Sequence, residues 1–169
     1  ADPPVVLMDE PFGALDPITR EQLQNEFLDL ETEIQKTVIF VTHDVFEAVK
    51  MGDRVALLDA GVLQQLATPA ELVENPANAF VDQFLGQHRF QLSLLTRPVR
   101  GLVSEAEDAT TGGEETGDGP RLHPRQSLIE AMDLFKTSRR DSLPVVSRGR
   151  KIGTLTKRAL LAHITQVLA

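Results

Sequence analysis

The sequence predicts an α/β fold, in which helices lie on the faces of the sheet. Two observations predict it. Short apolar runs of the kind found in buried strands alternate with segments whose apolar residues recur at helical spacing. An acidic, glycine-rich stretch over 101–120 then separates a larger part of the chain from a smaller one with the same mixed pattern. A chain of 169 residues has room for one ordinary domain and a small second one.

The larger part begins with a strand, a helix and a second strand. The run Val5–Met8 is apolar throughout, which is typical of a strand buried in a parallel sheet, and Thr37–Val41 has the same character. Between them, Asp16 followed by Pro17 is a typical helix start, so we predict an amphipathic helix over 17–35. Four apolar residues recur at helical spacing along it: Leu23, Phe27, Leu30 and Ile34.

Further helices and strands follow with clear boundary signals. Asp44 with Glu47 resembles a capping box at the start of a short helix that ends near Gly52. The later elements of this part are a strand over 54–58, a turn at 59–61, a strand over 62–66 and a helix between Thr68 and Pro76.

The smaller part is predicted to run helix, strand, strand, helix. Ser127 and Glu130 form a capping box for the first helix, and Thr156 caps the last one. The first helix carries Leu128, Met132 and Phe135 on one face, and the last carries Leu160, Leu161, Ile164 and Leu168. Two strands, over 143–146 and 152–155, flank a turn at 147–150.

Charge is unevenly spread along the chain, whose net charge is −8. Residues 1–100 carry 7 bases and 16 acids, residues 101–120 carry 6 acids and no base, and residues 121–169 carry 10 bases and 3 acids. An acidic chain is a poor general binder of nucleic acid, because duplex affinity rests on Lys and Arg at phosphates. The absence of cysteine excludes disulfides, thiolate metal sites and Cys nucleophiles. No apolar run is long enough to span a membrane, so a cytoplasmic location is expected.

Three polar features follow the predicted strands or open a helix. Asp9 and Glu10 come directly after the first strand, and His43 follows the second. If the strands are parallel neighbours, these side chains meet at one sheet edge, where ligands of α/β sheets bind. One carboxylate there can hold hydrated Mg²⁺, the other can accept a proton from water, and the imidazole can donate to a phosphate oxygen. Each feature also has an ordinary structural interpretation, as a strand exit, a turn residue or, for Asp16, a helix cap.

Taken together and in order, these features carry a family resemblance. The segments LMDEPFGALDP and VIFVTHD resemble the ATP-binding subunits of ABC transporters, whose core is a RecA-like P-loop NTPase fold. The resemblance implies that Asp9 holds Mg²⁺ through water and that Glu10 polarises the water that attacks ATP. It also implies that His43 contacts the γ-phosphate and that Asp16 acts across a dimer interface.

The same resemblance shows what this sequence lacks. It contains no glycine-rich loop ending in Gly-Lys-Ser/Thr, the phosphate cradle of P-loop proteins, and no signature sequence. In the family these motifs precede the segments quoted above, so residues 1–87 are expected to be the C-terminal portion of an ABC ATPase domain without its Walker A half. Without the backbone donors of that loop, we expect this polypeptide alone to bind ATP weakly and not to hydrolyse it.

Three further phrases, FGALDPITREQLQNEF, ATPAEL and NPANAFVDQFLG, are similar to importer ATPases for glycine betaine, carnitine and choline. Importers of polyamines, sulfate or amino acids are the alternative. The resemblance implies a homodimer beneath two membrane permease subunits, served indirectly by a solute-binding protein. Such a subunit is peripheral to the cytoplasmic face of the inner membrane and binds no nucleic acid.

The C-terminal part has a resemblance of its own. After a connector and linker over 88–120, residues 121–169 contain SLIEAMDLF, SLPVV and IGTLTKRALL, which resemble a single CBS motif. Such motifs work in pairs that bind adenine nucleotides or sense ionic strength, so a regulatory sensing module is an alternative function, and a generic α/β addition is another interpretation. The net charge of +7 here suggests contact with anionic lipid, although it also fits a solvated basic surface.

Overall fold

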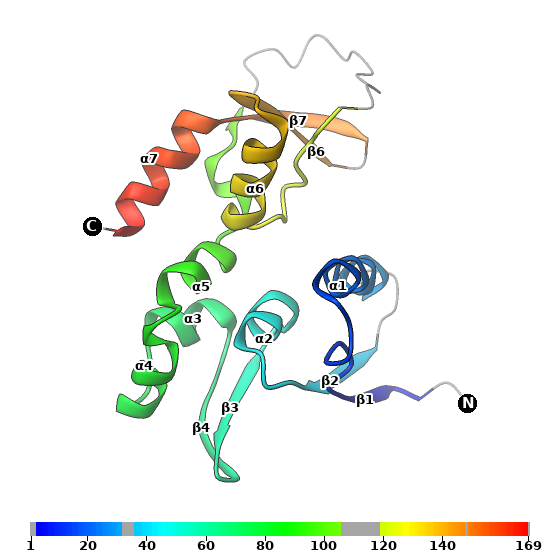
Figure 1. Ribbon diagram of the computed structural model, residues 1–169, viewed down its shortest axis with the longest axis vertical. Coiled ribbons are helices and arrows are strands. Elements are labelled where there is room, and N and C mark those ends of the chain that lie inside the picture. The colour runs from blue at the N-terminus through cyan, green and yellow to red at the C-terminus, as the bar shows by residue number, and fades with distance from the viewer. Residues whose placement is uncertain (1–2, 32–35, 106–118, 148, 169) are drawn as a thin grey trace.

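The α/β class is confirmed by the computed structural model, which describes residues 3–31, 36–105, 119–147 and 149–168 (Figure 1). Most of the predicted linker and Ile34 lie outside these residues. The elements are β1 (Val5–Asp9), α1 (Pro17–Glu31), β2 (Thr37–Val41), α2 (Val45–Met51), β3 (Val55–Asp59), β4 (Val62–Ala67), α3 (Pro69–Glu74), α4 (Ala79–Gly86), α5 (Arg89–Leu95), a 3-10 turn (Val99–Leu102), β5 (Ser104–Glu105), α6 (Leu128–Ser138), β6 (Ser142–Ser147), β7 (Arg150–Thr156) and α7 (Lys157–Leu168).

The strands form three small sheets. β1 and β2 pair in parallel, β3 and β4 form an antiparallel hairpin, and β5, β7 and β6 form an antiparallel sheet in that order. The hairpin turn places Ala60 and Gly61 at positive φ, a conformation that glycine adopts without strain. The predicted helix–strand–strand–helix order of the C-terminal part is confirmed, and β5 is an additional strand.

Helix starts agree well with the sequence. Asp16 accepts hydrogen bonds from the amides of Ile18 and Thr19, and Thr156 accepts one from the amide of Ala159. Capping boxes are present at the starts of α3 and α6, where Thr68 pairs with Glu71 and Ser127 pairs with Glu130. Local side-chain to backbone bonding needs no distant contact, which explains why the sequence predicted these starts.

Burial of the β1–β2 pair differs from the prediction. Alternate residues of both strands are exposed, and Leu7 retains 75% of its accessible surface. The expectation of fully buried strands is wrong for the described residues, because a helix covers one face of the pair and the other is open (Figure 1). The exposed apolar residues on this pair are Val5, Leu7, Ile39 and Val41.

The orientation of α1 is also different from the one expected. Leu23 and Leu30 of the predicted apolar face are exposed, whereas Gln24 is 6% exposed. The helix is therefore turned so that a polar residue faces the interior. The contacts of that residue, described below, explain the orientation.

Two hydrophobic cores organise the rest of the molecule. One is formed by α2, β3, β4, α3, α4 and α5, and its members include Leu72, Val81, Leu85 and Leu92. The other joins the C-terminal helices and strands with two residues that precede the predicted linker; its members include Leu94, Val99, Leu128, Phe135, Leu143 and Leu155.

Helix α5 contributes to both cores, with Leu92 in the first and Leu94 in the second. An ion pair of 3.7 Å between Lys50 Nζ of α2 and Glu130 Oε1 of α6 adds a polar link beside it. The division into residues 1–87, 88–120 and 121–169 stays a prediction. Every helix in the described part of the chain is too short or too polar to cross a bilayer.

Candidate active site

The parallel pairing of β1 and β2 brings the ends of the two strands together. Asp9 lies opposite Val41 in the register, and the amide of Glu10 donates a hydrogen bond of 2.9 Å to the carbonyl of Val41. The chain thus leaves both strands at the same edge. Because both strands end at the same edge of the sheet, the segment after β1 lies beside the segment after β2, as the sequence predicts.

Glu10 and His43 meet at this edge. His43 Nδ1 lies 2.8 Å from Glu10 Oε1, and the imidazole is 83% exposed. Glu10 has a φ of 46°, an uncommon conformation for a residue with a side chain. Its carbonyl accepts a hydrogen bond of 3.1 Å from the amide of Gly13, so a tight turn follows directly. The strand end and this turn together fix the carboxylate where the imidazole can reach it.

The contact changes the protonation of the imidazole. The hydrogen bond to Glu10 raises the pKa of His43 above its ordinary value of 6.5, and the negative charge of Glu10 raises it further. Asp44 and Glu47 add smaller effects in the same direction. Because the pKa is higher in the folded chain, the stabilisation is complete below the unfolded pKa and is lost as the pH rises through the folded pKa.

The substitution Glu10→Gln should therefore lower the pKa of His43, because it removes the carboxylate that stabilises the imidazolium. The histidine ring signals of the 169-residue chain can be followed by NMR from pH 5 upward. Glu26→Gln removes the same charge from an exposed position on α1 and should leave the pKa of His43 at the wild-type value. An unchanged pKa in Glu10→Gln would mean that the contact does not persist in solution.

The other two predicted site residues, Asp9 and Asp16, are not part of this contact. Asp9 is exposed at the end of β1. Asp16 is exposed and caps α1; hydrogen bonds from Thr19, with its side chain first, lower the pKa of the Asp16 carboxyl. The structure therefore joins Glu10 to His43, and the roles assigned to Asp9 and Asp16 stay predictions.

Metal binding was predicted at Asp9. Among the described residues, no group of three or more His, Asp or Glu side chains converges on one point. Mg²⁺ commonly keeps several waters and takes one or two protein carboxylates together with phosphate oxygens. Asp9 supplies an exposed carboxylate beside Glu10, which fits a magnesium site completed by waters and phosphate oxygens. It does not fit a site whose ligands all come from the protein.

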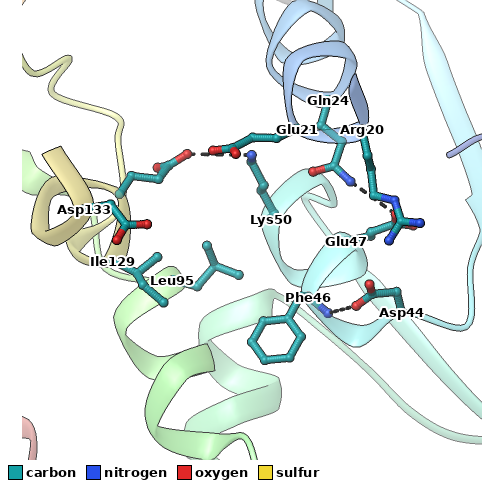
Figure 2. Close-up of a pocket in the computed structure, with 11 residues that line it drawn as sticks. Arg20, Glu21, Gln24, Asp44, Phe46, Glu47, Lys50, Leu95, Ile129 and Asp133 are labelled. Atoms are coloured by element: carbon teal, nitrogen blue, oxygen red, sulfur yellow. Dashed lines mark hydrogen bonds and ion pairs between the residues drawn. The ribbon is translucent and has the colours of Figure 1, made fainter. Parts of the chain in front are cut away.

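The structure adds a buried polar network that the sequence interpretation missed (Figure 2). Glu47 was predicted to complete a capping box with Asp44, and this is wrong. Asp44 does cap α2 by accepting a hydrogen bond of 2.8 Å from the amide of Phe46. Glu47 instead turns inward, where Thr42 and Gln24 donate hydrogen bonds to it. The sequence held one indication of this network: Gln24 is a polar residue directly after Leu23, which belongs to the predicted apolar face of α1.

The arrangement can accept and donate protons at one exposed sheet edge. A carboxylate that contacts a histidine can accept a proton from water, and the histidine can donate a hydrogen bond to an anionic oxygen. Both groups sit on loops that follow paired strands, so the sheet fixes their separation. These are the elements that phosphoryl transfer needs for its attacking water.

Solved structures offer loose likenesses. CbiO1 from Clostridium perfringens, part of the ABC transporter complex cbiONQ, matches 53% of this chain and 36% of its own, at 24% identity and a TM-score of 0.39. A CBS-domain protein from Burkholderia ambifaria MC40-6 matches 98% of this chain and 85% of its own, at 13% identity and a TM-score of 0.28. Both overlaps are too loose to carry an argument.

Sequence comparison is more informative, although no protein-family model matches the chain. The glycine betaine/carnitine/choline transport ATP-binding protein OpuCA of Bacillus subtilis is 43% identical over 148 residues, which are 88% of this chain and 36% of OpuCA. The osmoprotectant import ATP-binding protein OsmV of Salmonella typhimurium is 42% identical over 94% of this chain and 39% of its own length. The glycine betaine uptake system ATP-binding protein YehX of Escherichia coli is 39% identical over 96% of this chain and 51% of its own.

The chain spans between about a third and a half of the length of these relatives. The matches cross both cores, so they include the predicted ATPase part and the C-terminal part alike. The family resemblance that the sequence motifs predicted is confirmed. Over most of its length, the chain is a relative of part of the ATP-binding proteins of osmoprotectant ABC transporters.

Proposed function

We propose that this chain is the C-terminal portion of an ATP-hydrolysing subunit that drives uptake of quaternary-amine osmoprotectants such as glycine betaine, carnitine or choline. The observation that carries the proposal is the 2.8 Å contact between Glu10 and His43 at the ends of two parallel strands. The names of the relatives support the solute class, because they are transport proteins for these compounds. Importers of other solutes are the alternative outcome of the test below.

In the proposed reaction, Glu10 accepts a proton from the water that attacks the γ-phosphate, and His43 donates a hydrogen bond to a phosphate oxygen. Asp9 would hold Mg²⁺ through water. The ion, when bound, neutralises charge that develops on the phosphate oxygens. The exposure of His43 supports this assignment, since its imidazole is accessible to a nucleotide from solvent.

The proposed assembly is a homodimer of ATPase subunits beneath two membrane permeases at the cytoplasmic face of the membrane. Asp16 would act across the dimer interface, and its exposure beside the turn that follows Glu10 is compatible with that role. The solute-binding protein would act on the permeases and only indirectly on this subunit.

The function can be tested in a fusion with a relative. The part of Bacillus subtilis OpuCA that precedes its matched region is joined ahead of this chain, because the resemblance predicts that the Walker A loop precedes the segments found here. The fused subunit is produced with the OpuC permease and binding proteins in cells without other osmoprotectant uptake systems. We expect uptake of labelled glycine betaine, and none from the unfused chain, which should bind ATP weakly and not hydrolyse it. A fusion that assembles and hydrolyses ATP but supports uptake only in polyamine, sulfate or amino-acid systems would overturn the solute class.

One feature of the structure supports the predicted contact with anionic lipid. A cavity of about 490 Å³ opens between α6 and α7, and it carries exposed apolar and basic residues side by side. Three basic residues, Lys136, Arg139 and Lys157, and one acidic residue, Asp133, line it together with the apolar Met132, Phe135, Leu160 and Leu161. Apolar and cationic side chains together are typical of surfaces that lie on anionic membranes.

We therefore expect the full chain to float with phosphatidylglycerol vesicles at low salt and to be released at high salt, because screening shortens the reach of the basic groups. Lys136→Glu should reduce this binding, whereas Arg54→Glu, an equal charge change at an exposed site in the other part of the chain, should not reduce it comparably. If the chain bound phosphatidylcholine vesicles as well as phosphatidylglycerol vesicles, or bound neither at any salt concentration, contact with anionic lipid would be contradicted. The basic residues would then form an ordinary solvated surface.

A further inference from the structure

We infer that Glu47 is a positioning residue for His43, acting through Thr42 and held in place by Gln24. The inference deepens the proposed function, because it concerns the same histidine. Its evidence lies in the network behind the exposed edge, and its main test needs no nucleotide.

Glu47 is buried, with 5% of its surface exposed, and each oxygen of its carboxylate accepts a hydrogen bond. Thr42 Oγ1 donates a hydrogen bond of 2.7 Å to Oε2, and Gln24 Nε2 donates one of 3.2 Å to Oε1. Arg20 Nε lies 3.8 Å from Oε1. A buried carboxylate is costly unless such partners compensate it. The network therefore holds α1 against α2, as Figure 2 shows for Arg20, Gln24 and Glu47, and through Thr42 it also holds the loop after β2.

The loop in question carries His43 between two anchored neighbours. On one side, Thr42 donates to Glu47 and accepts a hydrogen bond of 3.1 Å from the amide of Asp44. On the other side, Asp44 caps α2. The imidazole itself is exposed, so its contact with Glu10 depends on where this backbone is held. Glu47 fixes that backbone from the interior.

Gln24 extends the network to α1, the helix that Asp16 caps. This explains why a glutamine takes the buried position on α1 while two leucines of the predicted apolar face are exposed. It also links the turn that leads into α1 with the loop that carries His43. We expect a displacement of α1 to move the imidazole through two hydrogen bonds, the one from Gln24 to Glu47 and the one from Thr42 to Glu47.

The test measures the pKa of His43 by NMR in the 169-residue chain, as above. The charged groups around the imidazole are Glu10, Asp44 and Glu47, so a variant of Glu47 changes charge as well as position. Gln24→Met and Thr42→Val avoid this problem, because they remove hydrogen bonds to Glu47 and leave every charge in place. Thr42→Val also removes the acceptor of the Asp44 amide, so Gln24→Met isolates the contribution of Glu47 more cleanly. We expect both to lower the pKa of His43 toward the value in Glu10→Gln.

Matched controls separate position from general damage. Gln22→Met makes the same chemical change at an exposed site on α1, and Thr42→Ser keeps the hydroxyl; both should retain the wild-type pKa. The ring signals of His88, His123 and His163 report whether a variant is folded. A wild-type pKa in folded Gln24→Met or Thr42→Val would overturn the inference, and so would an equal fall in Thr42→Ser and Thr42→Val. If one of the two variants does not fold, the other decides.

A double substitution tests whether Thr42 acts through Glu47. In a Glu47→Leu background, where the Thr42 hydroxyl has no acceptor at position 47, Thr42→Val should lower the pKa of His43 by less than it does in the wild-type chain, since only the hydrogen bond from the Asp44 amide is left to lose. An equal fall in the two backgrounds would contradict the pathway. In the fusion with OpuCA, Gln24→Met should lower kcat by about 10-fold and leave KM for ATP unchanged, as expected for a misplaced group. The NMR measurement needs no ATP. A negative NMR result therefore contradicts the role of Glu47 and leaves the proposed ATPase function to its own test.

Discussion

Replacing Glu10 by Gln in the OpuCA fusion is expected to reduce ATP hydrolysis by about 10²–10⁴-fold, the usual contribution of a general base. Gln has nearly the same size and can still contact His43, but it cannot accept a proton from water. Binding of ATP should persist, because the variant leaves Asp9 and the donated front segment unchanged. Hydrolysis at saturating Mg-ATP and binding of a fluorescent ATP analogue measure the two effects separately.

The matched control is Glu26→Gln, which removes an equal charge from the exposed side of α1. It should hydrolyse ATP at the rate of the unmodified fusion. Loss of hydrolysis in both variants would point to charge alone, and retention in both would remove Glu10 from the reaction. Loss of ATP binding in Glu10→Gln would instead assign this residue to nucleotide affinity.

The largest effect on stability is expected for Phe135→Ala, at about 3–5 kcal/mol. Phe135 is 2% exposed and lies in the C-terminal core with Leu128, Leu143 and Leu155. Its truncation removes apolar contacts and leaves a cavity, because close-packed surroundings collapse only partly. Thermal or denaturant unfolding of the full chain should show the loss in the transition of the C-terminal part.

Met132→Ala is the control on the same helix, since Met132 is 38% exposed and touches solvent. Its cost should be well below that of Phe135→Ala. The two cores share α5, so the first core should lose some stability when the second one unfolds. Equal costs for the two substitutions would contradict the burial that the structure assigns to this helix.

The edge that joins Glu10 to His43 was predictable from sequence because its determinants are local and topological. Val5–Met8 and Thr37–Val41 are strongly apolar and are separated by a segment long enough for one helix, the pattern of parallel neighbours. Polar residues directly after such strands must meet at one edge. Helix starts at Asp16, Thr68 and Ser127 were predictable for a similar reason, since caps bond within a few residues.

The role of Glu47 was not predictable, because a Glu at the third position of a helix satisfies a capping pattern whether or not it turns inward. Only the packing of α1 against α2 reveals that Gln24 and Thr42 compete successfully for its carboxylate. The open face of β1–β2 was not predicted for a related reason. An apolar strand sequence indicates that the strand is buried on both faces, but it does not identify the elements that pack against each face.

Whether Glu10 and His43 act as one unit is the central claim, and a double-mutant cycle in the OpuCA fusion tests it most directly. The rates of ATP hydrolysis are measured for Glu10→Gln, His43→Ala and the double variant. We predict that the double variant is no slower than the slower single variant, because residues that act together lose their shared contribution once. Two losses that multiply would show that the groups act independently and would contradict the site described above.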